Sequence, residues 1–338
     1  MVEVTHEGSM AVYRRMLEQP PGGPDLPHKT RPDAYSADGR SVVSVIRCNG
    51  RAEGIREALR LMGGVDRLTE GVEGEVLLKP NCNTDNPYPR DTHPDTMRAI
   101  AGSLIEAGLS PGQIRIGEIS GRARGLPTRH TLENIGMKAL AEEMGLKLSC
   151  FDEEEWVTVR PPRNTAWPDG IKIPRRVYEA ERVILSPIMR PHSTATFTIS
   201  MKLAVGMIDS VGREWLHNGE DHCEKLVALN LAFSADLVVA DATKMITGYG
   251  IGRVADPGII IAGSNRVAAD AVCVALMKQY GAIRVSDRPV LDHEQFVIGE
   301  RLGLGSPRLE DIDLRTSNTA GDAGFDDLIS AVEEELKG

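Results

Sequence analysis

SVVSVIRCNGRAEGIREALRLMGG (residues 41–64) joins a β-branched apolar run to a helical stretch, and EVLLKPN (residues 75–81) follows as a second short apolar run. β-branched residues are favoured in strands, and a compact apolar run of this length is typical of a buried strand. A strand, a helix and another strand in this order predict a βαβ unit, in which the two strands are parallel.

The same alternation continues through most of the chain. Helical patterns cover residues 96–107, 132–144, 223–232, 266–279 and about 326–336. Strand-like apolar runs are QIRIGEIS (113–120), LKLSCF (146–151), RVILSPIM (182–189), ADLVVADAT (235–243) and PGIIIAGS (257–264). We therefore expect an α/β protein with a mainly parallel, Rossmann-like sheet flanked by helices.

Two segments depart from this alternation. Residues 1–40 contain one short helical stretch and then PPGGPDLPHKTRP (20–32), which predicts an irregular N-terminal arm before an α/β domain over residues 41–338. Residues 151–180 read as a hairpin-like insert with Asp169-Gly170 as a turn. The pattern is compatible with two α/β halves, 41–150 and 181–338, or with one continuous sheet. For the arm, the alternatives are contact with a second subunit of a homodimer and a mobile segment.

Composition restricts the classes of function. The 338 residues are 41% hydrophobic and only 4% aromatic, with a formal net charge of -10 and no long basic run. This argues against binding to nucleic acid, which needs basic surfaces or stacking aromatics. We find no apolar stretch of the roughly 18 residues that a membrane span needs, and no signal-peptide pattern at the N-terminus. The sequence thus predicts a soluble, cytoplasmic protein without a membrane partner.

The cysteines indicate no cofactor. They are scattered and odd in number: Cys48, Cys82, Cys150, Cys223 and Cys273. Because no CxxC pair is present, the sequence contains neither an iron–sulfur motif nor a zinc ribbon. Scattered cysteines are also typical of a reducing compartment. The cofactor stays unknown, and a divalent metal ion is one alternative.

Polar residues follow several of the predicted strands, where open α/β sheets bind their ligands. Lysine and arginine bind carboxylate or phosphate, and histidine transfers protons or binds metals. We predict that the residues acting in catalysis are Lys79, His192, Lys202 and His217. We predict that the substrate-binding residues are Asn81, Asn83, Arg190, Thr194, Asp241, Gly248 and Gly250. Arg190, His192 and Thr194 alternate, so they share one face if the segment is extended.

Two of these positions leave alternatives open. Lys202 lies in an apolar stretch, so it either extends towards solvent from a helix edge or is a lysine with an altered pKa. His217 and Asp221 lie four residues apart, and His192, His217 and Asp241 are the candidate ligands for a metal ion.

A polar surface turn is the simpler interpretation for His222 and Cys223. Asp270, inside an apolar helix, is interpreted as a structural hydrogen-bonding partner for a loop.

Several of these segments, in this order, resemble one protein family. They are VLLKPN (76–81), RPHSTATFTISMKLAVGMI (190–208), Leu216-His217, VVADAT with the following GYG (238–250), IIAGSNRVAADAV (260–272) and GERLGLGSPRLEDIDL (299–314). The family is domain of unknown function 362. Its members are often linked to iron–sulfur clusters, so the resemblance implies redox or electron-transfer chemistry. This chain differs at Arg190-Pro191-His192, where the family usually has Lys-Thr-His, and at Lys202-Leu203, where it usually has Lys-Asn.

Three functions follow as expectations. The first is an enzyme that acts on a small anionic metabolite, with Lys79, Arg190 and Lys202 binding a carboxylate or phosphate and His192 or His217 moving a proton. The second is a metal- or redox-linked oxidoreductase similar to the iron–sulfur-associated relatives. The third is a non-enzymatic binding or scaffold protein that uses the N-terminal arm. The first is favoured, and its substrate and reaction class stay open.

Overall fold

The computed structural model describes residues 6–121, 127–248 and 252–337. Its centre is an eight-stranded sheet in the order β15-β2-β14-β11-β8-β3-β4-β5. These strands are β2 (Ser41–Arg47), β3 (Val76–Pro80), β4 (Ile114–Glu118), β5 (Lys147–Cys150), β8 (Arg182–Ser186), β11 (Leu237–Ala242), β14 (Ile259–Gly263) and β15 (Ile312–Asn318). β14 runs antiparallel to both of its neighbours, and every other neighbouring pair is parallel. The predicted mainly parallel α/β sheet is confirmed.

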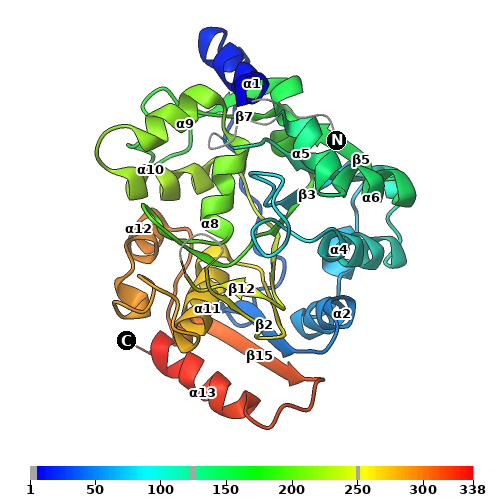
Figure 1. Cartoon of the computed structure of the whole chain (residues 1–338), viewed down its shortest axis with the longest axis vertical. Helices are drawn as coiled ribbons and strands as arrows, with labels where there is room; N and C mark the ends of the chain where they lie inside the picture. The colour runs from blue at the N-terminus through cyan, green and yellow to red at the C-terminus, as the bar shows by residue number, and fades with distance from the viewer. Residues whose placement is uncertain (1–5, 122–126, 249–251, 338) are drawn as a thin grey trace.

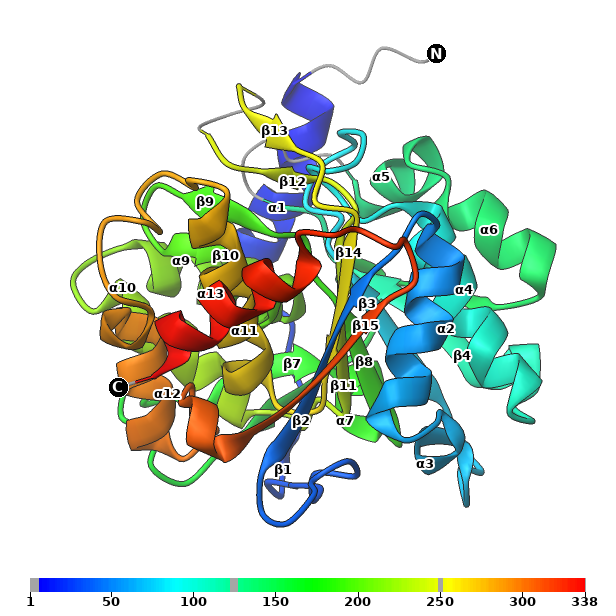
Figure 2. The same ribbon diagram turned by 90° about the horizontal axis from the view of Figure 1, so that it is seen from below.

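Helices cover both faces of the sheet, as Figure 2 shows with the sheet almost edge-on. On one face lie α2 (Arg51–Met62), α4 (Pro94–Glu106) and α6 (Met137–Met144). On the other face lie α11 (Arg266–Gln279) and α13 (Phe325–Leu336). This two-sided cover requires the inner strands to be apolar on both faces, which explains why they read as continuous aliphatic runs.

The strand side chains alternate between two hydrophobic cores. In β2, Val43 and Val45 belong to the core beneath α11, whereas Val42 and Ile46 belong to the core beneath α2 and α4. In β8, Ile184 belongs to the core beneath α2 and α4, whereas Val183 and Leu185 belong to the core beneath α11. The alternation follows from the two-residue period of a strand, so a shift of one residue would exchange the two faces.

The insert and the arm pack together. The insert contains β6 (Trp156–Val159) and β7 (Ile171–Pro174), which form the predicted antiparallel hairpin. The arm adds β1 (Asp25–Leu26) parallel to β6 and begins with α1 (His6–Glu18), which Figure 1 shows beside α9. The strands before and after the insert lie in the same eight-stranded sheet.

The structure differs from the predictions at three places. The helix expected over residues 132–144 is divided into α5 (Thr128–Asn134) and α6, because Gly136 takes a left-handed φ of 84°. The helix expected over 223–232 ends at Ala228 and continues as a short 3₁₀ turn. β15 was not predicted; as an edge strand it is polar on its exposed side and lacks the aliphatic run of a central strand.

The remaining elements connect this framework. The helices are α3 (Asp66–Thr69), α7 (Arg175–Glu179), α8 (Ser200–Leu203), α9 (Ser210–His217), α10 (His222–Ala228) and α12 (Glu294–Leu302). The short strands are β9 (Arg190–His192), β10 (Thr196–Thr198), β12 (Met245–Ile246) and β13 (Val254–Ala255). The 3₁₀ turns are Pro111–Gln113, Phe151–Glu153, Ala204–Met207, Leu229–Leu231, Val290–Asp292 and Leu309–Asp311. Within the described ranges, every helix falls short of the length and hydropathy required to cross a membrane.

Candidate functional site

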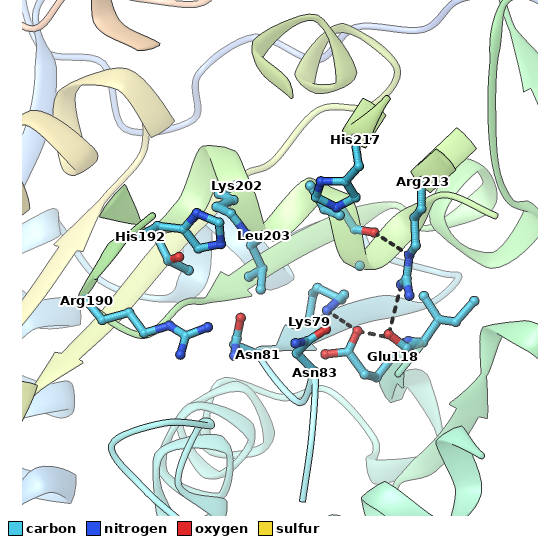
Figure 3. Close-up of a pocket in the computed structure, with 14 residues that line it drawn as sticks. Lys79, Asn81, Asn83, Glu118, Arg190, His192, Lys202, Leu203, Arg213 and His217 are labelled. Carbon is cyan, nitrogen blue, oxygen red and sulfur yellow. Dashed lines mark hydrogen bonds and ion pairs between the residues drawn. The ribbon is translucent and has the colours of Figure 1, made fainter. Parts of the chain in front are cut away.

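A pocket of about 620 Å³ opens at the carboxyl ends of β3, β4 and β8. Figure 3 shows side chains from distant segments converging on it, with Lys79, Asn81 and Asn83 on one side and Arg213 and His217 on another. Its lining residues are Lys79, Asn81, Asn83, Glu118, Ile119, Arg190, His192, Thr198, Lys202, Leu203, Val205, Gly206, Arg213 and His217. The structure therefore brings Lys79, His192 and Lys202 into one cavity.

A buried ion pair forms one wall of the pocket. Lys79 Nζ lies 2.6 Å from Glu118 Oε1, and the two side chains are 0% and 2% exposed. Lys79 Nζ also donates to the carbonyl oxygen of Pro80 at 2.6 Å. Glu118 accepts further hydrogen bonds from the backbone N–H groups of Cys82 and Ile119, at 2.7 and 2.9 Å. Because Glu118 matches its charge, Lys79 adds little net positive charge to the pocket.

Gly206 lies directly over this ion pair. A Cβ atom at this position would be 2.7 Å from Lys79 Nζ and 2.8 Å from Glu118 Oε1. Any side chain there would force the pair apart, so the close approach requires glycine.

Arg190 projects into the pocket from a small hairpin of β9 and β10. Its cross-strand partner is Thr198, and side chains of directly opposed residues lie on the same face. Arg190 Nε and Thr198 Oγ1 are both buried without a hydrogen-bond partner among the described residues. Burial and the neighbouring charge of Arg90 lower the pKa of Arg190. The hairpin therefore presents an arginine and a hydroxyl with unused hydrogen-bonding capacity.

Asn81 is held at the pocket by the loop that follows β3. Its Nδ2 donates to Asp91 Oδ1 at 3.2 Å, and its backbone N–H donates to Thr92 Oγ1 at 2.8 Å. Asp91 also accepts from Thr84 Oγ1 at 2.8 Å. Asn83, by contrast, is exposed at the rim of the pocket. The loop thus fixes the side-chain amide of Asn81 and places that of Asn83 against Gly121.

Lys202 is positioned by the buried carboxylate of Asp270. Asp270 Oδ1 accepts hydrogen bonds from Ser200 N at 2.9 Å and Ser200 Oγ at 2.5 Å, and Oδ2 accepts from Met201 N at 2.9 Å. These bonds fix the first turn of α8, so that the next residue, Lys202, lines the pocket. The interpretation of Asp270 as a structural partner for a loop agrees with these contacts, and α8 is the segment that it holds.

His192 has a defined tautomer. Its Nδ1 accepts hydrogen bonds from the backbone N–H groups of Thr194 and Ala195, at 3.2 and 3.1 Å. In the neutral ring the proton must then be on Nε2, which acts as a donor. Burial, together with the charges of Lys202 and Arg190, lowers the pKa of His192 to about 2. A neutral imidazole of this kind has a hydrogen-bond donor at Nε2 and is a poor base.

We expect His192 to remain neutral, with its proton on Nε2, from pH 8 down to at least about pH 4, because protonation would place a charge beside two cations and two N–H donors. Long-range ¹H–¹⁵N NMR spectra across this range would report the tautomer, with a His192→Gln variant to assign the signals. A ring that becomes doubly protonated between pH 6 and 7 would contradict the assignment.

Arg213 and two histidines complete the site on the α9 side. The Arg213 guanidinium is buried and donates to the carbonyl oxygens of Ser120 and Ile119, at 2.5 and 3.1 Å. Burial lowers the pKa of Arg213. His217, the last residue of α9, is exposed at the pocket and its ring stacks on His222 with 5.3 Å between centroids.

His222 is not the simple surface residue that the sequence suggested. It is partly buried, and its Nδ1 lies 3.0 Å from the carbonyl oxygen of Leu216, to which it donates. Its Nε2 is buried without a hydrogen-bond partner in the part of the chain that the structure describes. Burial and the Lys202 charge lower the pKa of His222, so the neutral ring keeps Nε2 as an acceptor.

Comparison with known proteins identifies the family of this chain. The model of the family described as Domain of unknown function (DUF362) matches residues 76–275, more than half of the sequence. This chain belongs to the DUF362 family. The match contains the described pocket residues from Lys79 to His217.

Two known proteins are similar to this DUF362 member. The thylakoid-associated protein sll1697 of Synechocystis sp. (strain ATCC 27184 / PCC 6803 / Kazusa) is 26% identical over 233 residues, which are 66% of this chain and 69% of that protein. The lactate racemase apoprotein of Thermoanaerobacterium thermosaccharolyticum is 14% identical, with a TM-score of 0.37. That match covers 63% of this chain and 52% of the racemase, so this chain spans about half of the racemase's length.

Some of the predicted substrate-binding residues lie outside the pocket of this DUF362 member. Thr194 is exposed in the turn after β9, because the strand ends at His192 and the alternation stops there; Thr198 takes the expected place beside Arg190. Gly248 is described but does not line the pocket, and Gly250 falls outside the described residues.

Asp241, predicted as a substrate or metal ligand, is occupied by protein groups. It forms an ion pair with Arg51 and accepts hydrogen bonds from Thr96 Oγ1 at 2.6 Å and Tyr88 OH at 2.9 Å. Burial alone would raise the pKa of Asp241, but Arg51 and the hydrogen bond from Thr96 hold it below its ordinary value. His192 and His217 line the pocket without it. Within residues 6–121, 127–248 and 252–337, no group of three or more His, Cys, Asp or Glu is arranged so that it could hold a metal ion.

Sequence reasoning missed Glu118, Thr198 and Arg213. Glu118 could have been found, because it is an acidic residue at the end of the apolar run QIRIGE, beside the strand that carries Lys79. Thr198 required knowledge of the β9–β10 pairing. Arg213 reaches the pocket from a helix far along the chain, and no local pattern distinguishes it from a surface arginine.

Proposed function

We propose that this protein is an enzyme acting on a small anionic metabolite that carries a carboxylate or a phosphate. One observation carries the proposal: Lys79 and Glu118 neutralise each other, whereas Arg190, Lys202 and Arg213 line the same pocket with no carboxylate paired to them among the described residues. Cations without an ion-pair partner in a partly enclosed cavity favour an anionic ligand.

The proposed roles differ from residue to residue. Arg190, whose Nε lacks a partner in the described structure, binds the anionic group of the substrate, since guanidinium matches carboxylate and phosphate geometry. Thr198 and Asn81 orient polar groups beside it. His192 donates from Nε2 to a substrate oxygen. Proton transfer is assigned to Lys202, because burial and the charges of Arg190 and Arg213 lower the pKa of Lys202 to about 8.

We expect Arg190→Met to weaken the binding of a small anion by about 10- to 100-fold, since hydrogen bonds to charged groups contribute about 1.5–3 kcal/mol. Isothermal titration with inorganic phosphate and with malonate, in the original protein and the variant, would measure this. The matched control is Arg98→Ala, which removes an exposed arginine paired with Glu143 outside the pocket. If both variants bind the anions as the original protein does, or if no anion binds at all, the proposal is wrong.

A further inference from the structure

The pocket is lined by two lysines, Lys79 and Lys202, in opposite electrostatic environments. Lys79 is fully buried, lies 2.6 Å from Glu118 Oε1 and donates to the Pro80 carbonyl. These contacts place a carboxylate and a carbonyl oxygen against its Nζ. Lys202 has neither an ion pair nor a hydrogen bond to any residue in the described ranges, and its nearest charges include Arg190 and Arg213. Among the described residues, the charges that act most strongly on Lys202 are those of two arginines.

An amine in this setting has the properties of a nucleophile. Lysine becomes reactive when desolvation or a neighbouring cation disfavours its protonated form, and the neutral amine then adds to carbonyl groups. Burial and the two arginines lower the pKa of Lys202 to about 8, so a substantial fraction of the amine is neutral near physiological pH. The backbone of α8 is fixed by Asp270, so this amine is held at the pocket rather than on a mobile loop.

The groups around Lys202 also suit a carbonyl substrate. His192 Nδ1 is occupied by two backbone N–H groups, which leaves Nε2–H as a neutral donor. A neutral imidazole donor polarises a carbonyl oxygen and does not protonate the nearby amine. Arg190 Nε and Thr198 Oγ1, unpartnered within the described structure, remain for a carboxylate on the same substrate.

We infer that the substrate is a 2-oxo carboxylate and that Lys202 forms an imine with its carbonyl carbon; this inference rests on the proposed function. The Lys202 nitrogen forms a bond to the carbonyl carbon and gives a carbinolamine. The C–O bond then breaks, the oxygen leaves as water with both amine protons, and the C=N bond is formed. No oxidant or reductant is required for these steps.

The test is reductive trapping. The full chain is incubated separately with pyruvate, glyoxylate and 2-oxoglutarate, reduced with sodium cyanoborohydride, and analysed by intact mass and peptide mapping. We expect one reduced adduct per chain with at least one of these acids, located on Lys202. Between pH 6 and pH 8 the trapping rate is expected to rise by up to about tenfold per pH unit and then to level off, because the neutral amine fraction follows that course below its pKa.

Two variants test whether the adduct forms on Lys202. Lys202→Arg keeps a cation in the pocket and is expected to bind the oxo acid but to lose the adduct completely. Lys225→Arg is the control, because Lys225 is a buried lysine outside the pocket lining, with its Nζ 3.1 Å from the Asn218 carbonyl oxygen; it is expected to keep the adduct.

The outcomes distinguish this inference from the proposed function. If all three acids leave Lys202 unmodified although at least one of them binds with Arg190-dependent affinity, the imine is excluded and the anion site stands. An adduct that persists in Lys202→Arg would also overturn the inference. If none of the acids, phosphate or malonate binds, both the inference and the proposed function are wrong.

Discussion

Lys79→Ala is expected to lower the free energy of unfolding by about 3–5 kcal/mol, the largest change that we expect for a single polar substitution in the pocket. The variant leaves the Glu118 carboxylate buried without its ion-pair partner, held by two backbone N–H groups and by the more distant charge of Arg213. The desolvation of that carboxylate is no longer offset by an ammonium at 2.6 Å. Urea denaturation followed by circular dichroism would measure the loss.

Two further variants test the cause of this loss. Arg98→Ala breaks an exposed ion pair with Glu143, and such pairs contribute about 0–1 kcal/mol, so that control should lose little stability. The double variant Lys79→Met with Glu118→Leu removes both charges and is expected to recover most of the stability. A Lys79→Ala variant that is as stable as Arg98→Ala would show that the pair is not buried as described.

Asp270→Ala is expected to destabilise the protein by about 3 kcal/mol, since it leaves buried hydrogen-bond donors on Ser200 and Met201 without an acceptor. The same change should release the first turn of α8 and with it the position of Lys202. Thermal and denaturant unfolding would measure the first effect, and hydrogen exchange at Ser200 and Met201 would measure the second.

Asp270→Asn separates the loss of acceptors from the loss of volume. It keeps one side-chain oxygen for the Ser200 donors and turns an amide towards the Met201 N–H, so an intermediate loss of stability is expected. Asp95→Ala, at an exposed site in the first turn of α4, is the matched control and should cost less than about 1 kcal/mol. Unchanged protection of residues 200 and 201 in Asp270→Ala would contradict the role of this carboxylate.

The central sheet was predictable because its inner strands are buried on both faces. Runs such as SVVSVIR and RVILS are aliphatic throughout, and no other element needs that composition at that length. β15 escaped prediction because an edge strand satisfies fewer packing constraints and its sequence, IDLRTSN, is mostly polar. The division between α5 and α6 depends on one glycine with positive φ, which an apolar pattern does not reveal.

The site was predictable where polar residues follow strands in the chain. Lys79, Asn81 and Arg190 lie at such places, and topology alone brings them together. Arg213 depends on how α9 packs over the sheet, which no short stretch of sequence encodes. The sequence also does not reveal that His192 Nδ1 accepts two backbone hydrogen bonds. These bonds leave Nε2–H as a hydrogen-bond donor in the neutral ring.

The pairing of β15 with β2 bears on how the chain reaches its native state during synthesis. Ser41 pairs with Ile312 and Arg47 pairs with Asn318, so two segments that leave the ribosome far apart in time form one edge of the sheet. Until the second segment emerges, β2 exposes unpaired backbone groups to other nascent chains. Contacts this distant in sequence slow folding and expose intermediates to aggregation, so cotranslational folding of this protein should depend on chaperones that cover β2.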